Sequence, residues 1–331
     1  MESKERIQWI DFVKGIAILC VVWKHIKWEP DYFGKIICAF HMPIFFIITG
    51  ILLYVKNDLN KTTSKNFMKK KASALLYPYV IFSVLSILIL LMRHRFVIEN
   101  LIDTIILTGY SALWFLPCLF FSESLSYVLL KNKQKRFVLV MGVAGILLVS
   151  MFGKNFFRDV VENKWILSIL INITRICTSS VFILLGYFGY KFIKDEAKCD
   201  NVVIAIFLMI CGISLALLNN GEVVLKDNNL YNPIFFYLSA NMICWGIIIL
   251  CKKIKSANSL ICYWGKNSLI ILVTHIPMSI VSIVKWKIPV TTHIYIVDCV
   301  IVFVVVMIIE SILIYAINRW AKFLIRFPEI N

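Results

Sequence analysis

The stretch RIQWIDFVKGIAILCVVWKH, residues 6–25, decides the fold, because its apolar length suits a membrane helix while it carries Asp11, Lys14 and His25. On an α-helix, Lys14 and His25 lie within about 20° of each other in projection, and Asp11 lies about 40° from His25. Lys14 and His25 are about 16 Å apart along the axis, roughly half a bilayer core. A charged group inside a membrane helix is costly unless it faces a partner or a water-filled cavity. The shared stripe therefore predicts a functional site.

A purely structural interpretation of this stripe is also open. Lys14 would extend toward the nearer headgroups, Asp11 would cap the start of the helix, and His25 would lie at the opposite interface. This first segment alone does not decide between the two interpretations.

The second apolar segment, CAFHMPIFFIITGILLY at residues 38–54, favours a site. Pro43 removes one helical hydrogen bond and frees the carbonyl around Ala39, so the backbone is expected to bend or open beside His41. A short outer connection between the two segments places His25 and His41 in the same half of the membrane. Because no third ligand stands at a suitable spacing, proton transfer is expected of these histidines, and no metal.

The composition indicates a polytopic membrane protein. The chain has 331 residues, of which 60% are hydrophobic and 16% charged. The net charge of +16 would suggest nucleic-acid binding in a soluble protein. Here the bases lie in short loops between apolar segments, so they indicate topology, and no nucleic-acid partner is expected. The ten cysteines form no C-x-x-C pair, which indicates neither a disulfide framework nor a zinc site.

We predict an all-α helical bundle of about ten transmembrane helices, and a single membrane-embedded domain over residues 1–331 with no appended soluble domain. The charged first segment is expected to be an uncleaved span. Basic loops put both termini in the cytoplasm of a multi-pass cell-membrane protein. A short extra helix is expected over residues 101–108, and residues 165–172 are expected to lie along the interface. The expected spans are 9–26, 35–55, 75–92, 113–130, 137–152, 173–193, 202–218, 233–251, 267–284 and 294–317.

The amphiphilic run 64–74 contains Lys69, Lys70 and Lys71 and is expected on the cytoplasmic face. Attraction to anionic lipid explains such a run, with about 1 kcal/mol per charge near the surface. Binding of a polyanionic cytosolic ligand is the alternative. Inside the apolar segments, Glu123 and Glu310 are expected to be buried, and one of them is expected to bond across helices.

Together these segments resemble the opening of the membrane-bound acyltransferase-3 family, and in particular surface-polysaccharide O-acetyltransferases and fucose-4-O-acetylase-like proteins. The family motif is a basic residue, ten residues and then histidine, which Lys14 and His25 match. Further similarity lies in Tyr77-Pro78-Tyr79, in Leu113-Trp114-Phe115-Leu116, in Arg175 ahead of Leu185-Gly186-Tyr187, and in Gly265-Lys266-Asn267-Ser268 leading to His275 and Pro277. The similarity covers nearly the whole chain.

The resemblance implies transfer of acetyl from cytosolic acetyl-CoA to a hydroxyl of a cell-surface or lipid-linked saccharide, without a metal. His25 is the expected general base or transient acyl carrier, with His41 and Asp11 as further catalytic candidates. Lys14, Lys69, Lys70 and Lys71 are the candidates for binding CoA phosphates. Membrane lipid, a second copy in a homodimer and other polysaccharide-synthesis proteins are candidate partners. The candidates for holding the saccharide or the oxyanion are Arg93, Trp114, Arg175 and His275.

Two other classes of function stay open. A transporter or flippase for lipid-linked saccharides would also have about ten spans with charged groups near the midplane. A non-catalytic membrane scaffold of a polysaccharide-synthesis complex is the second alternative. It gives no reason for the stripe of Lys14 and His25. His275 has its own structural alternative, a core histidine satisfied by a backbone carbonyl.

Overall fold

The computed structural model describes residues 7–27, 31–132, 135–194, 201–254, 258–287 and 294–327. Within these ranges the regular structure is helical throughout, which confirms the predicted all-α class. The α-helices are α1 (Gln8–Ile26), α2 (Tyr32–Phe40), α3 (Pro43–Lys56), α4 (Asp58–Lys61), α5 (Ser64–Met92), α6 (Ile98–Ile105), α7 (Phe115–Lys131), α8 (Arg136–Val160), α9 (Lys164–Ile193), α11 (Val202–Leu218), α12 (Pro233–Lys253), α13 (Ser259–Lys266), α14 (Ser268–Thr274), α15 (Ile280–Lys287) and α16 (Tyr295–Trp320). The 3-10 helices are η1 (Ser111–Trp114), η2 (Leu225–Asp227) and η3 (Lys322–Leu324).

The bundle has the dimensions and surface of a membrane protein. Seven helical segments of the described chain are long and apolar enough to cross a bilayer. Large apolar side chains are exposed along α8, α11 and α16, where they would face lipid. The shorter α11 and the charge-bearing α1 coincide with the predicted spans 202–218 and 9–26. The count of ten spans and the side on which the termini lie stay predictions, and four of the lysines and arginines that set this orientation (residues 4, 6, 133 and 255) lie outside the described residues.

The structure differs from three of the predicted boundaries. Residues 165–172 do not form a separate interfacial segment, because α9 is one continuous helix whose start is capped by the side chain of Asn163. The run 64–74 is likewise continuous with the third span, since α5 runs unbroken through Pro78. The predicted short helix at 101–108 is present as α6, shifted by three residues toward the N-terminus.

Two predicted spans are broken helices. The second span divides into α2 and α3 at His41 and Met42, with Pro43 as the first residue of α3, which confirms the predicted break. The ninth span divides into α14 and α15, with His275 directly after α14 and Pro277 in the turn between the two helices. In both cases a proline prevents the helix from continuing, so that a histidine lies at a helix end in the interior.

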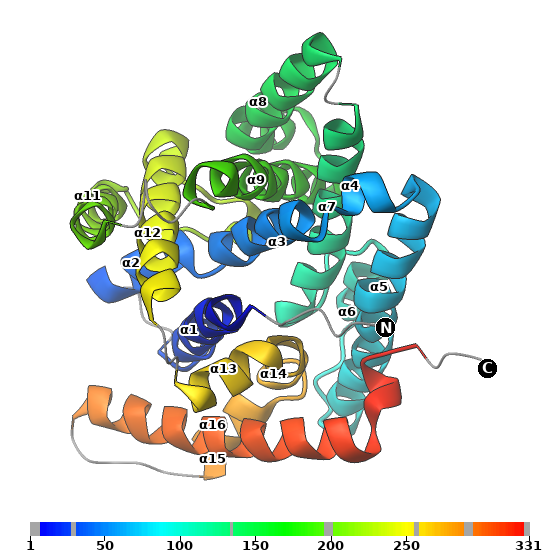
Figure 1. The fold of residues 1–331 in the computed structure, drawn as a ribbon. Helices are drawn as coiled ribbons and strands as arrows, with labels where there is room; N and C mark the ends of the chain where they lie inside the picture. Colours follow the sequence, from blue (N-terminus) through cyan, green and yellow to red (C-terminus); the bar gives the residue numbers. More distant parts are fainter. Residues whose placement is uncertain are drawn as a thin grey trace.

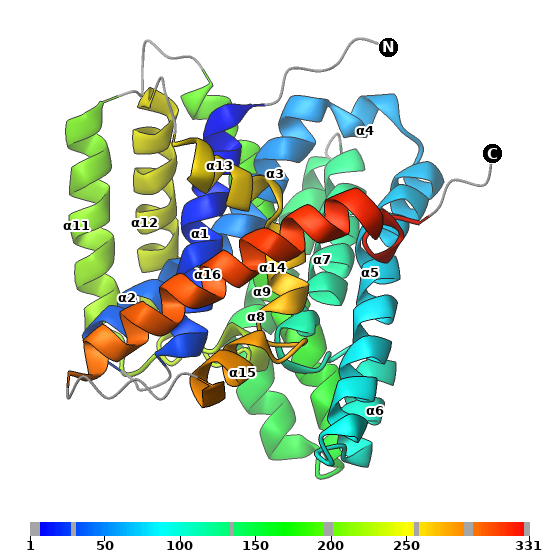
Figure 2. The ribbon, with the colours of Figure 1, turned by 90° about the horizontal axis from the view of Figure 1, so that it is seen from below.

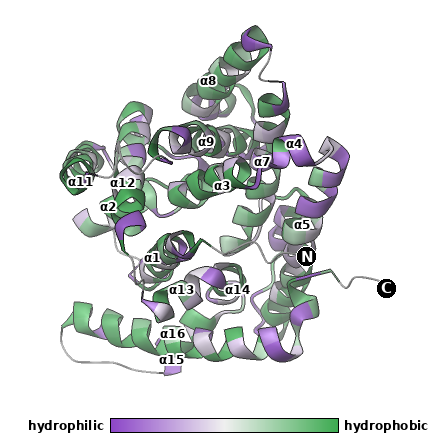
Figure 3. Cartoon of the chain, viewed as in Figure 1, coloured by the Kyte–Doolittle hydropathy of each residue, from purple (hydrophilic) through white to green (hydrophobic). Residues whose placement is uncertain are grey.

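Helix α1 lies in the middle of the molecule, between α3 on one side and α13 and α14 on the other, with α16 crossing outside them at a slant (Figures 1 and 2). Two glycines allow α1 and α13 to approach closely. A Cβ at Gly15 would lie 2.2 Å from the Ile261 carbonyl oxygen, and one at Gly265 would lie 1.8 Å from that of Asp11. Hydrophobic residues cover most of the helices, and hydrophilic ones gather near α4 and the start of α5 (Figure 3).

Candidate active site

The centre of the candidate site is a contact between two histidine rings. His25 comes from the last turn of α1, and His275 follows the end of α14. Their ring centroids are 5.1 Å apart, with an angle of 52° between the ring planes. His275 is fully buried, whereas His25 is partly exposed. Sequence reasoning expected His41 as the neighbour of His25, but the ring contact is with His275.

His275 has a defined tautomer. Its Nδ1 lies 2.6 Å from the carbonyl oxygen of Ile271, and because a carbonyl can only accept, Nδ1 carries the proton. In the neutral ring Nε2 then holds the lone pair, and this atom has no hydrogen-bond partner in the described part of the chain. The sequence left two interpretations of His275 open, a site residue or a core histidine bonded to a backbone carbonyl. In the structure His275 both bonds to the Ile271 carbonyl and contacts His25.

His41 is held in the same manner. Its Nδ1 donates to the carbonyl oxygen of Ile37 at 2.7 Å, again four residues earlier in the chain. His41 also interacts electrostatically with His25, as do Lys24 and Lys226. The three histidines therefore share one environment, with two of them fixed by carbonyls at the two helix breaks.

An ion pair holds the end of α1 that carries His25. The Nζ atom of Lys24 lies 2.6 Å from Oε2 of Glu222, which belongs to the loop 219–232 between α11 and α12. The other oxygen of Glu222 accepts the backbone N–H of Asp31 at 3.0 Å. Gly34 lies against this carboxylate, because a Cβ there would be 2.1 Å from Oε1 of Glu222. Lys24 and Glu222 are far apart in the sequence, and nothing in either segment indicated that they would meet.

Arg175 and Trp114, both predicted to contact the saccharide, lie together. The guanidinium of Arg175 lies over the indole of Trp114, 4.9 Å from the ring centroid. Its Nη1 donates to the carbonyl oxygen of Lys226 at 2.6 Å, and its Nη2 donates to the side chain of Asn172. Helix η1, which carries Trp114, packs against α14, which leads to His275. The loop residue Lys226 therefore links the arginine to the histidines.

The predicted donor residues lie in two places. Asp11 is buried on the face of α1 that meets α13, and Lys14 of the same helix is half-buried. Lys69 and Lys70 are exposed on the first turns of α5, but Lys71 forms an ion pair with Glu123 of α7. This pair gives Glu123 the cross-helix partner that sequence reasoning could not name. Lys69 and Lys70 stay exposed, as does Lys65 earlier in the same run.

Two further residues complete the predicted set. Arg93 lies directly after α5, and no interaction within the described chain joins it to the histidine pair. Glu310 of α16 is fully buried and accepts a hydrogen bond from Thr274 at 2.6 Å, directly before His275. Its second oxygen has no partner in the described residues. In those residues no group of three or more histidine, cysteine, aspartate and glutamate side chains is arranged for a metal ion.

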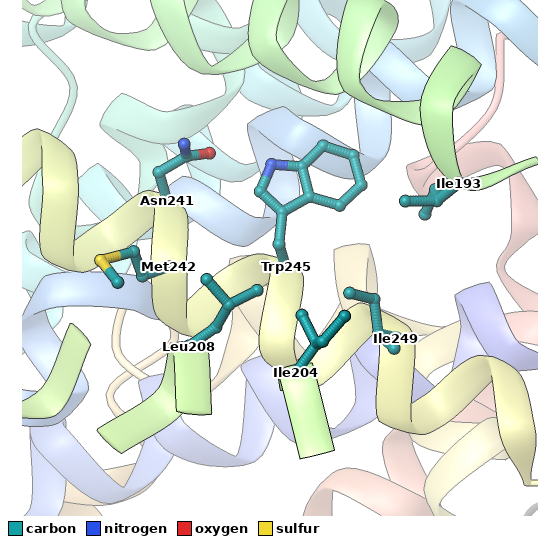
Figure 4. Close-up of a pocket in the computed structure, with 7 residues that line it drawn as sticks. All are labelled: Ile193, Ile204, Leu208, Asn241, Met242, Trp245 and Ile249. Atoms are coloured by element: carbon teal, nitrogen blue, oxygen red, sulfur yellow. The ribbon is translucent and has the colours of Figure 1, made fainter. Parts of the chain in front are cut away.

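A surface groove between α9, α11 and α12 is lined by largely apolar side chains (Figure 4): Ile193, Ile204, Leu208, Asn241, Met242, Trp245 and Ile249. A second groove lies between α13 and α16 and is also largely apolar. Neither groove is lined by a histidine, an arginine or a lysine. Both suit contact with lipid chains, and we place no chemical step in them.

The comparison with protein families places most of the chain in one of them. A family model described as an acyltransferase domain, that of the acyltransferase-3 family, matches residues 7–315. The matched stretch contains both helix breaks, the histidine pair and the site around Arg175 and Trp114. The comparisons with curated proteins and with solved structures give no match. The chain therefore belongs to the acyltransferase-3 family, and it is a membrane acyltransferase.

Proposed function

We propose that this acyltransferase moves acetyl from cytosolic acetyl-CoA to a hydroxyl of a cell-surface or lipid-linked saccharide, with His25 as the general base. The observation that carries this proposal is the contact of His25 with His275 beside a third histidine, His41. A saccharide hydroxyl is a poor nucleophile near neutral pH, so it needs a group that removes its proton as it attacks. A partly exposed imidazole beside two fixed imidazoles suits that task.

The reaction balances without any further component. The hydroxyl oxygen attacks the thioester carbon, His25 takes the hydroxyl proton, and the carbon–sulfur bond breaks. His25 then returns the proton to the leaving thiolate, which departs as CoA. The same residues support a second route. In it, His25 itself attacks the thioester carbon, and the carbon–sulfur bond breaks to release the CoA thiolate. The saccharide hydroxyl then attacks the acyl-imidazole and frees His25, and the hydroxyl proton ends on the thiolate.

The donor and the acceptor are proposed to approach from opposite ends of the bundle. Lys69 and Lys70, exposed at the start of α5, together with Lys14 of α1, are the proposed contacts of the CoA phosphates on the cytoplasmic side. Trp114 and Arg175 are the proposed contacts of the saccharide. The termini are proposed to be cytoplasmic, consistent with α1 beginning at the end of the bundle where α16 ends (Figure 2).

Replacing His25 tests the proposal. His25→Gln keeps a polar side chain of similar reach but removes the titrating nitrogen, so acetyl transfer should fall by about 100-fold or more. The measurement is transfer of labelled acetyl from acetyl-CoA to membrane glycan, at matched protein amounts. The matched control is His94→Gln, because His94 is exposed just beyond α5 and should leave transfer unchanged.

The pH profile gives an independent check. Since a protonated imidazole cannot accept the hydroxyl proton, transfer by the wild-type protein should decline once the pH falls far enough to protonate His25. Near-normal transfer by His25→Gln would exclude His25 as the base. Normal acetylation combined with a block in glycan export would favour the transporter function instead.

A further inference from the structure

Arg175 is a buried cation that contacts neutral partners. It is only 2% exposed, and its guanidinium donates to the Lys226 carbonyl and the Asn172 amide oxygen while it covers the Trp114 ring. Its Nε has no hydrogen-bond partner among the described residues. The thiol of Cys118 is a further hydrogen-bonding neighbour of the guanidinium. None of the ion pairs in the described chain includes Arg175, and Asp227 attracts it without such a contact.

A charge in this position is unusual, because buried charges in proteins are normally paired with an opposite charge. Carbonyl and amide oxygens offset only part of the desolvation cost of a guanidinium. Arginine at such a position, with an open N–H donor, has the chemistry that binds carboxylate and phosphate groups. Arg175 therefore has the character of an anion site whose anion comes from outside the chain.

The site lies beside the proposed reaction centre. The peptide carbonyl that Arg175 holds belongs to Lys226, and Lys226 also interacts electrostatically with His25. Trp114, whose ring lies against the guanidinium of Arg175, belongs to η1, which packs against the helix that precedes His275. A ligand that reached Arg175 would therefore have its remaining atoms near the histidines, and Lys226 would add a second positive charge.

We propose that the acceptor is an anionic saccharide and that Arg175 binds its negative group. The group is either the carboxylate of a sugar acid or the phosphate of a lipid-linked sugar. The anion displaces the Lys226 carbonyl from Nη1, and the open Nε provides a further donor. The inference rests on the proposed function for the statement that the ligand is the acceptor. The anion site itself depends on Arg175 and its neighbours.

Ligand binding to the full-length protein in detergent tests the site without requiring turnover. Thermal unfolding is followed with three probes: methyl glucuronide, glucose 1-phosphate and neutral methyl glucoside. We expect stabilisation by at least one anionic probe and little by methyl glucoside. A shift with methyl glucuronide identifies a sugar acid, whereas a shift with glucose 1-phosphate alone identifies a phosphate. Equal stabilisation by all three probes would overturn the proposal without the use of any variant.

Two variants then assign the effect to Arg175. In Arg175→Met the apparent Kd of the effective probe should rise by about 10- to 100-fold, as expected for the loss of a charged hydrogen-bond donor. Arg175→Lys keeps the charge and should lose less affinity for the probe. It also provides a measurement if the methionine variant does not fold. Arg158→Met is the matched control, since Arg158 is exposed on the last turns of α8. Unchanged binding by the Arg175 variants would refute the assignment.

Transfer assays separate this inference from the proposed function. If an anionic probe binds through Arg175 but no saccharide receives acetyl, the anion site stands and the acetyltransferase function fails. If acetyl is transferred equally well to neutral and anionic acceptors, and independently of Arg175, the function stands and the anionic acceptor is refuted.

Discussion

Neutralising Glu222 should impair both stability and activity, and the loss should be partly reversed by a second substitution. Glu222 lies 2.6 Å from Lys24, and the two side chains are only 13% and 17% exposed. Glu222→Gln preserves the size of the side chain and an oxygen that can accept from the Asp31 N–H, but it removes the charge. The positive charge of Lys24 then lies next to His25 without its partner.

The structure sets the size of the effect. At 2.6 Å and an effective dielectric constant of 20, the attraction between the two charges is about 6 kcal/mol, and desolvation offsets much of it. Leaving the Lys24 charge without its partner should lower the free energy of unfolding by about 3 kcal/mol. Lys24→Met combined with Glu222→Gln removes both charges, so the loss should be no more than about 1 kcal/mol.

Activity should follow the same order. When His25 takes the hydroxyl proton it becomes positive, and the nearby positive charge of Lys24 opposes this step. Glu222→Gln should therefore transfer acetyl more slowly than the double variant, although the double variant carries more changes. Such a recovery is not expected if Glu222 acts only by filling space.

The assay combines thermal unfolding in one fixed detergent with transfer of labelled acetyl. The control is Glu99→Gln, because the Glu99–Lys164 pair spans 3.6 Å and is 49% and 67% exposed. An exposed pair of this kind contributes about 0.5 kcal/mol or less. The reasoning is refuted if Glu222→Gln behaves like Glu99→Gln, or if the double variant is no better than Glu222→Gln alone.

Two further predictions concern the donor and the helix packing. Removing Lys69 and Lys70 together should raise the KM for acetyl-CoA by about 5- to 10-fold at low salt, because each exposed lysine contributes about 1 kcal/mol or less to phosphate binding. The KM for the acceptor should not change, and an unchanged KM for acetyl-CoA in steady-state assays would indicate that the run binds lipid only. Gly186→Ala should lower the melting temperature, because its Cβ would lie 2.1 Å from the Ile47 carbonyl oxygen. Gly145→Ala is the control, since a Cβ there meets open space and should leave the melting temperature unchanged. Equal melting temperatures of the two variants would contradict the close packing of α3 and α9.

The broad fold could be predicted because hydropathy and proline act locally. Apolar runs of sufficient length gave the spans, and Pro43 alone gave the break beside His41. Hydropathy failed at residues 165–172, where an apolar stretch at the interface and the first turns of a long helix look alike in sequence. The side chain of Asn163 ahead of that stretch was the available signal, since asparagine favours the cap position.

The side chains that pair across helices could not be predicted from the sequence. Such pairs depend on how each helix is rotated and how deep it lies, and these are set by packing between distant segments, which leaves no local pattern in the sequence. One of Glu123 and Glu310 was expected to bond across helices. The structure gives both a partner, with Lys71 beside Glu123 and Thr274 beside Glu310. The same holds for Glu222, whose loop had no feature that would connect it with the end of α1.

The two helix breaks explain how three histidines come together, although the proposed reaction needs only one of them as a base. In each break the histidine stands two residues before a proline, at His41 and Pro43 and at His275 and Pro277. The proline keeps the helix from continuing, and the imidazole Nδ1–H is then fixed on the carbonyl four residues earlier. His25 instead lies on the last turn of an unbroken helix and is partly exposed. Two imidazoles of fixed tautomer beside a third that is partly exposed form a preorganised, acceptor-rich surrounding. If His25 is the base, as proposed, this surrounding needs little rearrangement when His25 takes up a proton.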